Sequence, residues 1–439
     1  MKNMRLFKKS VVAVTVALAS QQAVAAGFQL NAQSATGIGR AFAGDAVIAD
    51  NASVMARNPA AMALFDDVAL SLGFETLITD IEASNVNYQG LFGNGNESYN
   101  DIGGTSVAPN IHLIVPVNDT FAWGVNIYSN FGTKTEFDDN LSWSEYGGLT
   151  DLASVNFGIS GSYRLNNQWS FGAGLDLIYG TGKLSRVAGK GMGTVINPGT
   201  PVLCPGDEPC VIGLPKGTSL LDVDAKGFGV GFNIGTVYEL DENNRFGLSY
   251  RYSPEIEAEG DVEYLGNSDS NGKLYLPLPD MAEFSGYHRI PDTKFAAHYS
   301  VQWIGWRAFD ELEAKINGEK EILNEYNWQN GWHYAIGGTY YLNQDWTLRA
   351  GYMYDTSAQG DTKSVSVPDS DRQWFSAGFT YNIDKQSNVD FGFTYLAGKD
   401  VKVEESTENP AIPGTDISSI SATTRANAIL VGLQYSRTF

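Results

Sequence analysis

Long hydrophobic runs are scarce in this chain of 439 residues, whose mean hydropathy is −0.19. Outside the N-terminus no run of about 18 apolar residues occurs, which argues against membrane-spanning helices. Histidine is also rare, with four copies, and neither a GxSxG nor an HExxH motif is present. We therefore expect neither an enzyme nor a cofactor or metal site, although the histidines still permit a Ser-His or Asp-His dyad.

The chain also contains few cysteines and few basic residues relative to acidic ones. The two cysteines, Cys204 and Cys210, fit neither a CxxC redox motif nor a zinc site in their spacing and number. In an exported protein they would form a disulfide that closes a small loop. Lys and Arg number 29 against 50 Asp and Glu, and the net charge of −21 argues against nucleic-acid binding.

Export is predicted by the first 25 residues. A basic stretch precedes the short apolar core Val11–Ser20, and Ala23-Val24-Ala25 has the small-x-small form of a cleavage site. A membrane anchor is the alternative, but this core is too short to span a bilayer. We interpret residues 1–25 as a signal peptide, and its basic residues are Lys2, Arg5, Lys8 and Lys9.

From residue 68 onwards, apolar residues alternate with small or polar ones. Val155–Leu165 and Trp169–Tyr179 both place apolar residues at most odd positions. Side chains alternate across a strand, so each such segment has one apolar and one polar face. A soluble sandwich would show the same alternation. The aromatic residues at strand ends, together with the signal peptide, favour an outer-membrane barrel.

The connections between the predicted strands alternate in length. Asn118-Asp119 and Asn166-Asn167 are tight polar turns, whereas residues 83–104 and 188–225 are long connections. Short turns on one side and long loops on the other are typical of bacterial barrels, which have an even number of strands. The sequence predicts an all-β membrane protein, a 14-stranded antiparallel barrel over 68–439, with strands near 68–82, 105–117, 120–137, 152–165, 167–187, 226–240, 244–260, 273–290, 294–315, 331–342, 345–356, 372–383, 388–403 and 426–439.

Residues 26–67 lack the alternation and are rich in Ala, Gly, Asn and Ser. A barrel of this size would be open if it were empty. Irregular backbone is tolerated at membrane depth when protein encloses it. We therefore interpret residues 26–67 as an N-terminal hatch, or plug, inside the barrel.

The last predicted strand alternates from Ile429 to the terminal Phe439. It must pair with the first strand, because an open sheet edge is not tolerated in lipid. Its final aromatic residue resembles the signal that the outer-membrane assembly machinery reads, so this machinery is an expected partner.

Several polar residues should point into the barrel by the same parity. A charge in that position needs a partner or water. These side chains could simply hold the plug, or they could line a polar path for cargo. The predicted lumen residues are His112, Arg164, Asp176, Arg251 and Arg349. Arg186, just before the longest outer connection, could hold an anionic headgroup or be solvated.

The chain resembles the FadL family of outer-membrane long-chain fatty-acid transporters, some members of which carry aromatic hydrocarbons. The resemblance covers the whole mature chain and depends on a combination of motifs. These are GFQLN (Gly27–Asn31), GIGRAFAGDA (Gly37–Ala46), RNPAA (Arg57–Ala61), Pro109–Asp119, Ser129–Phe137, Ser162–Gly172 and Val365–Trp374.

The resemblance implies a monomeric 14-stranded barrel with an N-terminal hatch. It implies that the mature N-terminus reaches the ligand pocket, which makes Gly27, Phe28 and Leu30 candidate ligand-sensing residues. It also implies an anchored hatch corner at Asn58, Pro59 and Ala60. Pro59 fixes its own φ and disfavours helix at Asn58, which suits such a corner. A kink that opens the wall sideways maps to Asn130, Phe131 and Gly132.

The family's carboxylate-binding arginine matches Arg186. At the position of the family's second headgroup-binding residue, a lysine, this chain has Glu313. Lys315, two residues further on and on the same strand face, is therefore the candidate for the second headgroup cation. The function implied is passive uptake of long-chain fatty acids from an outer groove to a lumen pocket and out through the wall. The alternatives are a monoaromatic-hydrocarbon channel, an adhesin or phage receptor, and a general porin. Contact with outer-membrane lipid or lipopolysaccharide is also expected.

Overall fold

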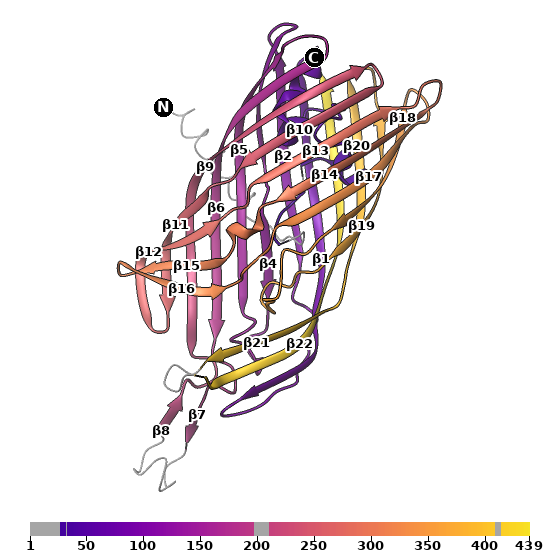
Figure 1. The fold of residues 1–439 in the computed structure, drawn as a ribbon. Coiled ribbons are helices and arrows are strands. Elements are labelled where there is room, and N and C mark those ends of the chain that lie inside the picture. The colour runs from indigo at the N-terminus through magenta and orange to yellow at the C-terminus, as the bar shows by residue number, and fades with distance from the viewer. Residues whose placement is uncertain (1–26, 32, 197–209, 409–413) are drawn as a thin grey trace, which may run out of the picture.

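The computed structural model describes residues 27–31, 33–196, 210–408 and 414–439. They form a tilted barrel with short turns at one end and extended strands at the other (Figure 1). The wall has 14 antiparallel positions, which confirms the predicted barrel. It closes where β1 pairs with β22, from Ala69 opposite Thr438 outwards.

Eight wall positions are single strands. They are β1 (Ala69–Gly90), β2 (Thr105–Pro116), β5 (Leu149–Arg164), β6 (Trp169–Val187), β9 (Ser219–Asp241), β18 (Trp346–Asp355), β19 (Arg372–Asn382) and β22 (Asp416–Thr438). Six positions are each divided into two strands. These are β3 (Phe121–Tyr128) with β4 (Gly132–Glu136), β10 (Asn244–Tyr252) with β11 (Glu255–Tyr264), β12 (Asn267–Pro277) with β13 (Met281–Arg289), β14 (Phe295–Ile304) with β15 (Glu311–Ile316), β16 (Glu319–Glu325) with β17 (Gly331–Tyr341), and β20 (Ser387–Gly398) with β21 (Val401–Glu408).

Much of the length expected as outer loops is strand instead. β1 continues to Gly90 because β22 pairs with it up to Ser418. β11 and β12 are joined by a tight turn, and so are β15 and β16. The outer half of the molecule is therefore a continuation of the barrel wall. A small separate hairpin, β7 (Gly193–Ile196) with β8 (Cys210–Gly213), projects beyond it (Figure 1).

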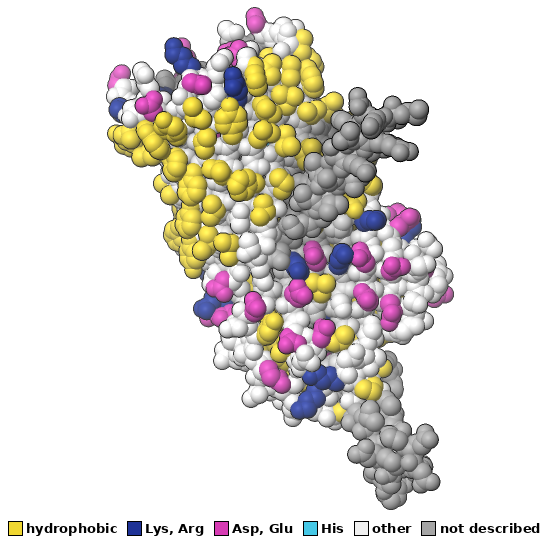
Figure 2. All heavy atoms as spheres, turned by 180° about the vertical axis from the view of Figure 1, so that it is seen from behind, with side chains coloured by type: hydrophobic (Ala, Val, Ile, Leu, Met, Phe, Trp, Pro, Cys, Tyr) yellow, Lys and Arg dark blue, Asp and Glu magenta, His cyan; other side chains and the backbone are white. Residues whose placement is uncertain are grey.

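An apolar belt surrounds the half of the barrel nearest the short turns. Figure 2 shows hydrophobic side chains across this half and charged side chains beyond it at both ends. Leu175 on β6 and Val230 on β9 are 59% and 64% exposed, which suits contact with lipid rather than water. No helix within the described residues is long and apolar enough to cross a membrane.

The N-terminal segment lies inside the barrel. It contains α2 (Ala35–Gly39), α3 (Val54–Arg57) and the 3-10 helix η1 (Pro59–Leu64); a second 3-10 helix, η2 (Trp306–Ala308), interrupts the wall between β14 and β15. α2 packs on β18, β19, β20 and β22, and η1 packs on β3, β5, β6 and β9. Strands on opposite sides of the barrel therefore contact the same segment.

Glycines in the wall allow this close packing. A Cβ on Gly351 would lie 2.1 Å from the Arg40 carbonyl oxygen, and one on Gly172 would lie 2.3 Å from the Ala60 nitrogen. Inward-facing serines add hydrogen bonds, because the hydroxyls of Ser300 and Ser71 accept from main-chain N–H groups of the segment. The alternation of small residues on the lumen face thus has a structural cause.

Candidate functional site

The barrel wall has a break between β3 and β4. Tyr128 pairs with Asn156 of β5, and Gly132 pairs with Ala153. Four steps along one strand therefore match three along the other, so one surplus residue lies between them, as in a β-bulge. The burial pattern shows the same surplus residue. Even-numbered residues point inwards in β3, whereas the odd-numbered Thr133 and Thr135 point inwards in β4.

On its β2 side, the break lacks strand pairing within the described residues. β3 pairs with β2 from Pro116 to Ile111 only. Among the described residues, no pairing joins β4 to the remainder of β2. The two sides approach again at the outer end, where the Glu136 N–H donates to the Ile102 carbonyl oxygen at 3.0 Å. The wall is thus interrupted at the kink that the resemblance placed at Asn130, Phe131 and Gly132.

The start of the N-terminal segment fills this interruption as a short added strand. Gln29 lies opposite Phe131 in an antiparallel bridge. The Leu30 N–H donates to the Asn130 carbonyl oxygen at 2.5 Å, and the Gly132 N–H donates to that of Phe28 at 2.9 Å. The break therefore finds its hydrogen-bond partners in the N-terminal segment.

Gln33 connects both sides of the break. Its side-chain Nε2 donates to Oδ1 of Asn130 at 2.7 Å. Its carbonyl oxygen accepts from Nε2 of His112 on β2 at 3.1 Å. All of these side chains are buried. His112, predicted as a lumen residue, thus contacts the N-terminal segment beside the break.

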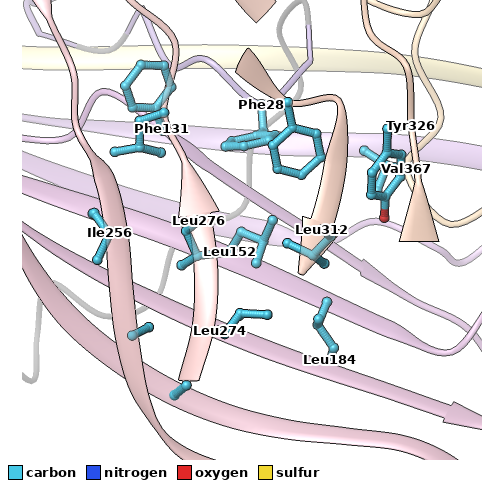
Figure 3. Close-up of a cluster of buried hydrophobic side chains, with 14 of the residues drawn as sticks. Phe28, Phe131, Leu152, Leu184, Ile256, Leu274, Leu276, Leu312, Tyr326 and Val367 are labelled. Carbon is cyan, nitrogen blue, oxygen red and sulfur yellow. The ribbon is translucent and has the colours of Figure 1, made fainter. Parts of the chain in front are cut away.

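Phe28 is enclosed by aromatic rings. Its ring centre lies 4.6 Å from Trp306, 5.1 Å from Phe309, 5.8 Å from Trp328 and 6.2 Å from Phe131. Three of the contacts are edge-to-face, a favourable geometry for aromatic pairs. Figure 3 shows Phe28 and Phe131 at one edge of a larger apolar cluster.

Gly27 and Leu30 lie on either side of this contact. Gly27 has φ of +61°, and a Cβ there would lie 2.6 Å from atoms of both Trp306 and Trp328. Only glycine fits such a position, since it lacks a Cβ and tolerates positive φ. Leu30 belongs to a separate buried cluster with Phe42 and Trp374. Phe28 is therefore the tip residue that enters the aromatic cluster.

A cavity of about 280 Å³ lies on the outer side of this cluster, and Arg186 lines it. Leu184, Leu312 and Tyr326 line the cavity and also belong to the apolar cluster that contains Phe28 (Figure 3). Apolar side chains thus continue from the cavity to Phe28 and the wall break. No metal-binding group of His, Cys, Asp and Glu occurs among the described residues.

The side chain of Arg186 is held by hydrogen bonds to β6, which carries it, and to the neighbouring β5. Nη1 donates to the carbonyl oxygens of Leu149 at 2.5 Å and Ser185 at 2.8 Å, and Nη2 donates to Oγ1 of Thr150 at 2.7 Å. Within the described chain these contacts leave Nε and one hydrogen of Nη2 for a ligand. The guanidinium is thus held in place beside the cavity.

Lys315 is not brought to Arg186. On β15, Leu312, Ala314 and Ile316 are buried and face the interior, so Glu313 and Lys315 face outwards. Glu313 pairs with Lys320 at 2.6 Å. The expectation that Glu313 and Lys315 share a face agrees with the strand, but that face is the outer one. Lys315 therefore does not substitute as the second headgroup cation.

The other predicted lumen residues contact the N-terminal segment or each other. Arg164 donates to the Ala63 carbonyl oxygen at 2.6 Å, and Arg251 to that of Ala56 at 2.7 Å. Arg251 also pairs with Asp176. Arg349 lies 3.2 Å from Asp50, which itself pairs with Arg40. This placement fits a role in holding the segment.

The Asn58-Pro59-Ala60 corner is fully buried. Asn58 is extended, with φ of −144°, and caps the 3-10 helix that Pro59 begins. Its Nδ2 donates to the carbonyl oxygens of Ala46 at 2.9 Å and Thr236 at 3.0 Å, and its Oδ1 accepts from the Ala60 N–H. The corner therefore joins two parts of the segment to β9.

Some contacts of the site had no local signal in the sequence. Gln33, Trp306 and Trp328 meet the wall break or Phe28 only through long-range folding. The parity change between Tyr128 and Thr133 is the one local sign of the kink. The signal peptide and Cys204 lie outside the described residues, as does the side chain of Cys210, so the disulfide stays a prediction.

The closed barrel, its apolar belt and the filled lumen define an outer-membrane transport protein. The chain belongs to the family described as "Outer membrane protein transport protein (OMPP1/FadL/TodX)", whose profile matches residues 16–439. Membership of a transport family confirms that the chain is not an enzyme.

Two relatives illustrate the similarity. The long-chain fatty acid transport protein of Escherichia coli O6:H1 is 39% identical over 430 residues, which cover 92% of this chain and 94% of that one. Outer membrane protein P1 of Haemophilus influenzae is 36% identical over 99% of this chain and 100% of its own.

Two solved structures share the fold. A Pseudomonas aeruginosa FadL homologue matches with a TM-score of 0.78 at 21% identity, over 94% of this chain and all of that one. The Pseudomonas putida toluene transporter TodX matches with a TM-score of 0.61 at 17% identity, over 89% and 94%.

Proposed function

We propose that the protein carries long-chain fatty acids passively across the outer membrane, with residues 26–67 acting as a hatch. A fatty acid collects in the outer cavity with its head at Arg186 and its tail towards Phe28. It then leaves sideways through the break beside Gly132. The relatives named as fatty-acid transporters support the substrate class.

One observation carries this route. Phe28 belongs to the cluster that continues the outer cavity, and its carbonyl oxygen also accepts from the Gly132 N–H at the wall break. A ligand tail that displaces the Phe28 ring would therefore withdraw the strand that fills the break. Entry of the ligand and opening of the exit are coupled through a single residue.

The free energy needed to withdraw Phe28 is similar in size to the free energy gained by burying part of an acyl chain. Burying one phenylalanine is worth about 1.5–3 kcal/mol, and each main-chain hydrogen bond adds about 0.5–1.5 kcal/mol. Withdrawing Phe28 and its ladder thus costs roughly 3–6 kcal/mol. An acyl chain gains about 0.8 kcal/mol per buried methylene, so a tail of four to eight buried methylenes, at about that value each, suffices.

A single-residue deletion tests the lateral exit. Removing Asn130 takes out the surplus residue and lets Tyr128–Gly132 match β5 in continuous register. We expect the uptake of labelled oleate to fall strongly, because β4 would then pair with β2 and close the wall. Deleting Asn140 from the adjoining outer connection is the control. Unchanged uptake in the Asn130 deletion would exclude this exit.

A monoaromatic-hydrocarbon channel is the second candidate, favoured by the aromatic rings around Phe28. A neutral hydrocarbon cannot accept hydrogen bonds from the guanidinium of Arg186, whereas the carboxylate of a fatty acid can. Competition between toluene and oleate for the purified protein separates the two. We further expect a monomer in contact with lipopolysaccharide and assembled by the outer-membrane machinery.

A further inference from the structure

The outer cavity carries more negative than positive groups. Arg186 is its cation, and Glu145 and Glu405 also line it. The remaining ionisable side chains of the lining are Tyr146, Tyr264 and Tyr326. With both carboxyl groups ionised, the lining would repel an anionic ligand.

Glu405 is placed to face the cavity. It lies on β21, beyond the apolar belt, where it is half-buried and shares its strand face with the buried Val403. Its Oε1 accepts from the Val365 N–H at 2.5 Å. Burial is the main influence on this side chain and raises the pKa of its carboxyl group to about 7, against the opposing effects of the hydrogen bonds from Val365 and Ser364 and of the charge of Arg186. Glu405 is therefore more readily protonated than a glutamate in free solution.

The carboxyl group of Glu145 already accepts hydrogen bonds from neighbouring side chains. Its Oε1 accepts from the hydroxyls of Tyr88 at 2.7 Å and Ser418 at 2.9 Å. Burial raises the pKa of this carboxyl group as well, but two donors already stabilise the charged form. Glu405 also accepts hydrogen bonds from two groups, but the charge of Arg186 acts on it, so it is the carboxyl group better placed to share a ligand head with that cation.

We propose that the cavity loads a fatty acid together with one proton, which the ligand carboxyl group and Glu405 share while Arg186 donates to the ligand's other oxygen. This inference rests on the proposed function and specifies its ligand. The proton comes from water, and no covalent bond forms or breaks. A protonated Glu405 donates a hydrogen bond where an ionised one would repel.

The consequence is selectivity for heads that can share a proton. A carboxylate can accept a hydrogen bond from Glu405 or take the proton itself. An alkyl sulfate can accept the hydrogen bond only weakly, because its oxygens are far less basic, and it cannot take the proton. A single cation opposite two carboxyl groups thus selects carboxylic acids over permanent anions of equal chain length, which Arg186 alone would not do.

The test measures laurate binding to the purified full-length protein between pH 6 and pH 8.5, with dodecyl sulfate below its micellar concentration for comparison. Glu405→Gln is compared with wild type, because the difference between them cancels the titration of laurate itself. If one proton is taken up, wild-type affinity falls about tenfold more than that of Glu405→Gln between pH 6 and 8. Glu404→Gln, on the exposed face of the same strand, is the matched control.

The outcomes separate the two proposals. A common pH dependence for wild type and Glu405→Gln, or equal binding of laurate and dodecyl sulfate by the wild type, overturns proton-coupled loading. If the wild type binds laurate at none of these pH values, the proposed function itself fails. Heat-dependent migration of the barrel in detergent gels verifies that each variant is folded.

Discussion

Arg186 and Lys315 differ in the direction in which their side chains point. Arg186 points inwards at the end of β6 and lines the outer cavity. Lys315 lies on the outward face of β15. A long side chain cannot reach through its own strand, so only the first is available to a ligand head in the cavity.

Arg186→Ala should weaken binding of oleate by about tenfold to a hundredfold, since hydrogen bonds to charged groups are worth about 1.5–3 kcal/mol. Binding of a neutral hydrocarbon of similar length should change little. Displacement of a fluorescent fatty acid gives both affinities. Lys183→Ala, on the same strand but paired with Asp224 on the outer face, is the control. Equal loss for both ligands would remove Arg186 as the headgroup residue.

The lumen residues were accessible to sequence reasoning because strand parity is strictly local. Asp176, Arg251 and Arg349 occupy inward positions in regular strands, and all three are buried. Trp306 and Trp328 were not accessible, because they flank an interruption of the wall where parity is lost. Gln33 lies in irregular backbone, so only its long-range partners His112 and Asn130 give it a position.

At the scale of elements, the N-terminal segment is held at one end and inserted at the other. The Asn58 corner is joined to β9 by a buried amide. The Phe28 end pairs with the wall break. Arg57 connects the two, because it precedes the corner and donates to Oδ1 of Asn31 at 2.8 Å. The corner and the inserted end are therefore linked through the Arg57 side chain.

Asn58→Ala should loosen the hatch while leaving the barrel intact. The substitution removes a side chain with three hydrogen bonds and leaves buried groups unsatisfied, which costs about 1–3 kcal/mol for each such group. We expect larger and noisier ion conductance in planar bilayers. Asn140→Ala, with an exposed side chain, is the control. Conductance equal to that of the wild type would show that the corner does not secure the hatch.

The number of wall elements was predictable, but their lengths were not. Alternation identifies a strand wherever one face meets lipid, as at Val155–Leu165. Beyond the belt both faces meet water or protein, so alternation fades and strands such as Glu255–Tyr264 were read as loop in part. The division of six wall positions follows from local breaks that alternation cannot distinguish from turns.

At the scale of the whole molecule, the cavity, the N-terminal segment and the wall break are in contact with one another. The outer cavity shares side chains with the cluster around Phe28. Phe28 and Leu30 share main-chain hydrogen bonds with the break. Since the lumen is filled by the buried N-terminal segment, a straight passage along the barrel axis would require removing that segment. A sideways exit requires moving only its tip.

The most direct test of this account is a reversible lock on the tip. Gln29 and Phe131 are opposite each other in a bridge whose hydrogen bonds lie on the flanking residues. Such pairs have Cα atoms about 4.5 Å apart, which suits a disulfide. The double variant Gln29→Cys, Phe131→Cys is made with Cys204 and Cys210 replaced by Ser. We predict that oleate uptake is lost when the lock is oxidised and returns on reduction. Uptake that continues at full rate with the disulfide formed would contradict the lateral, hatch-controlled route.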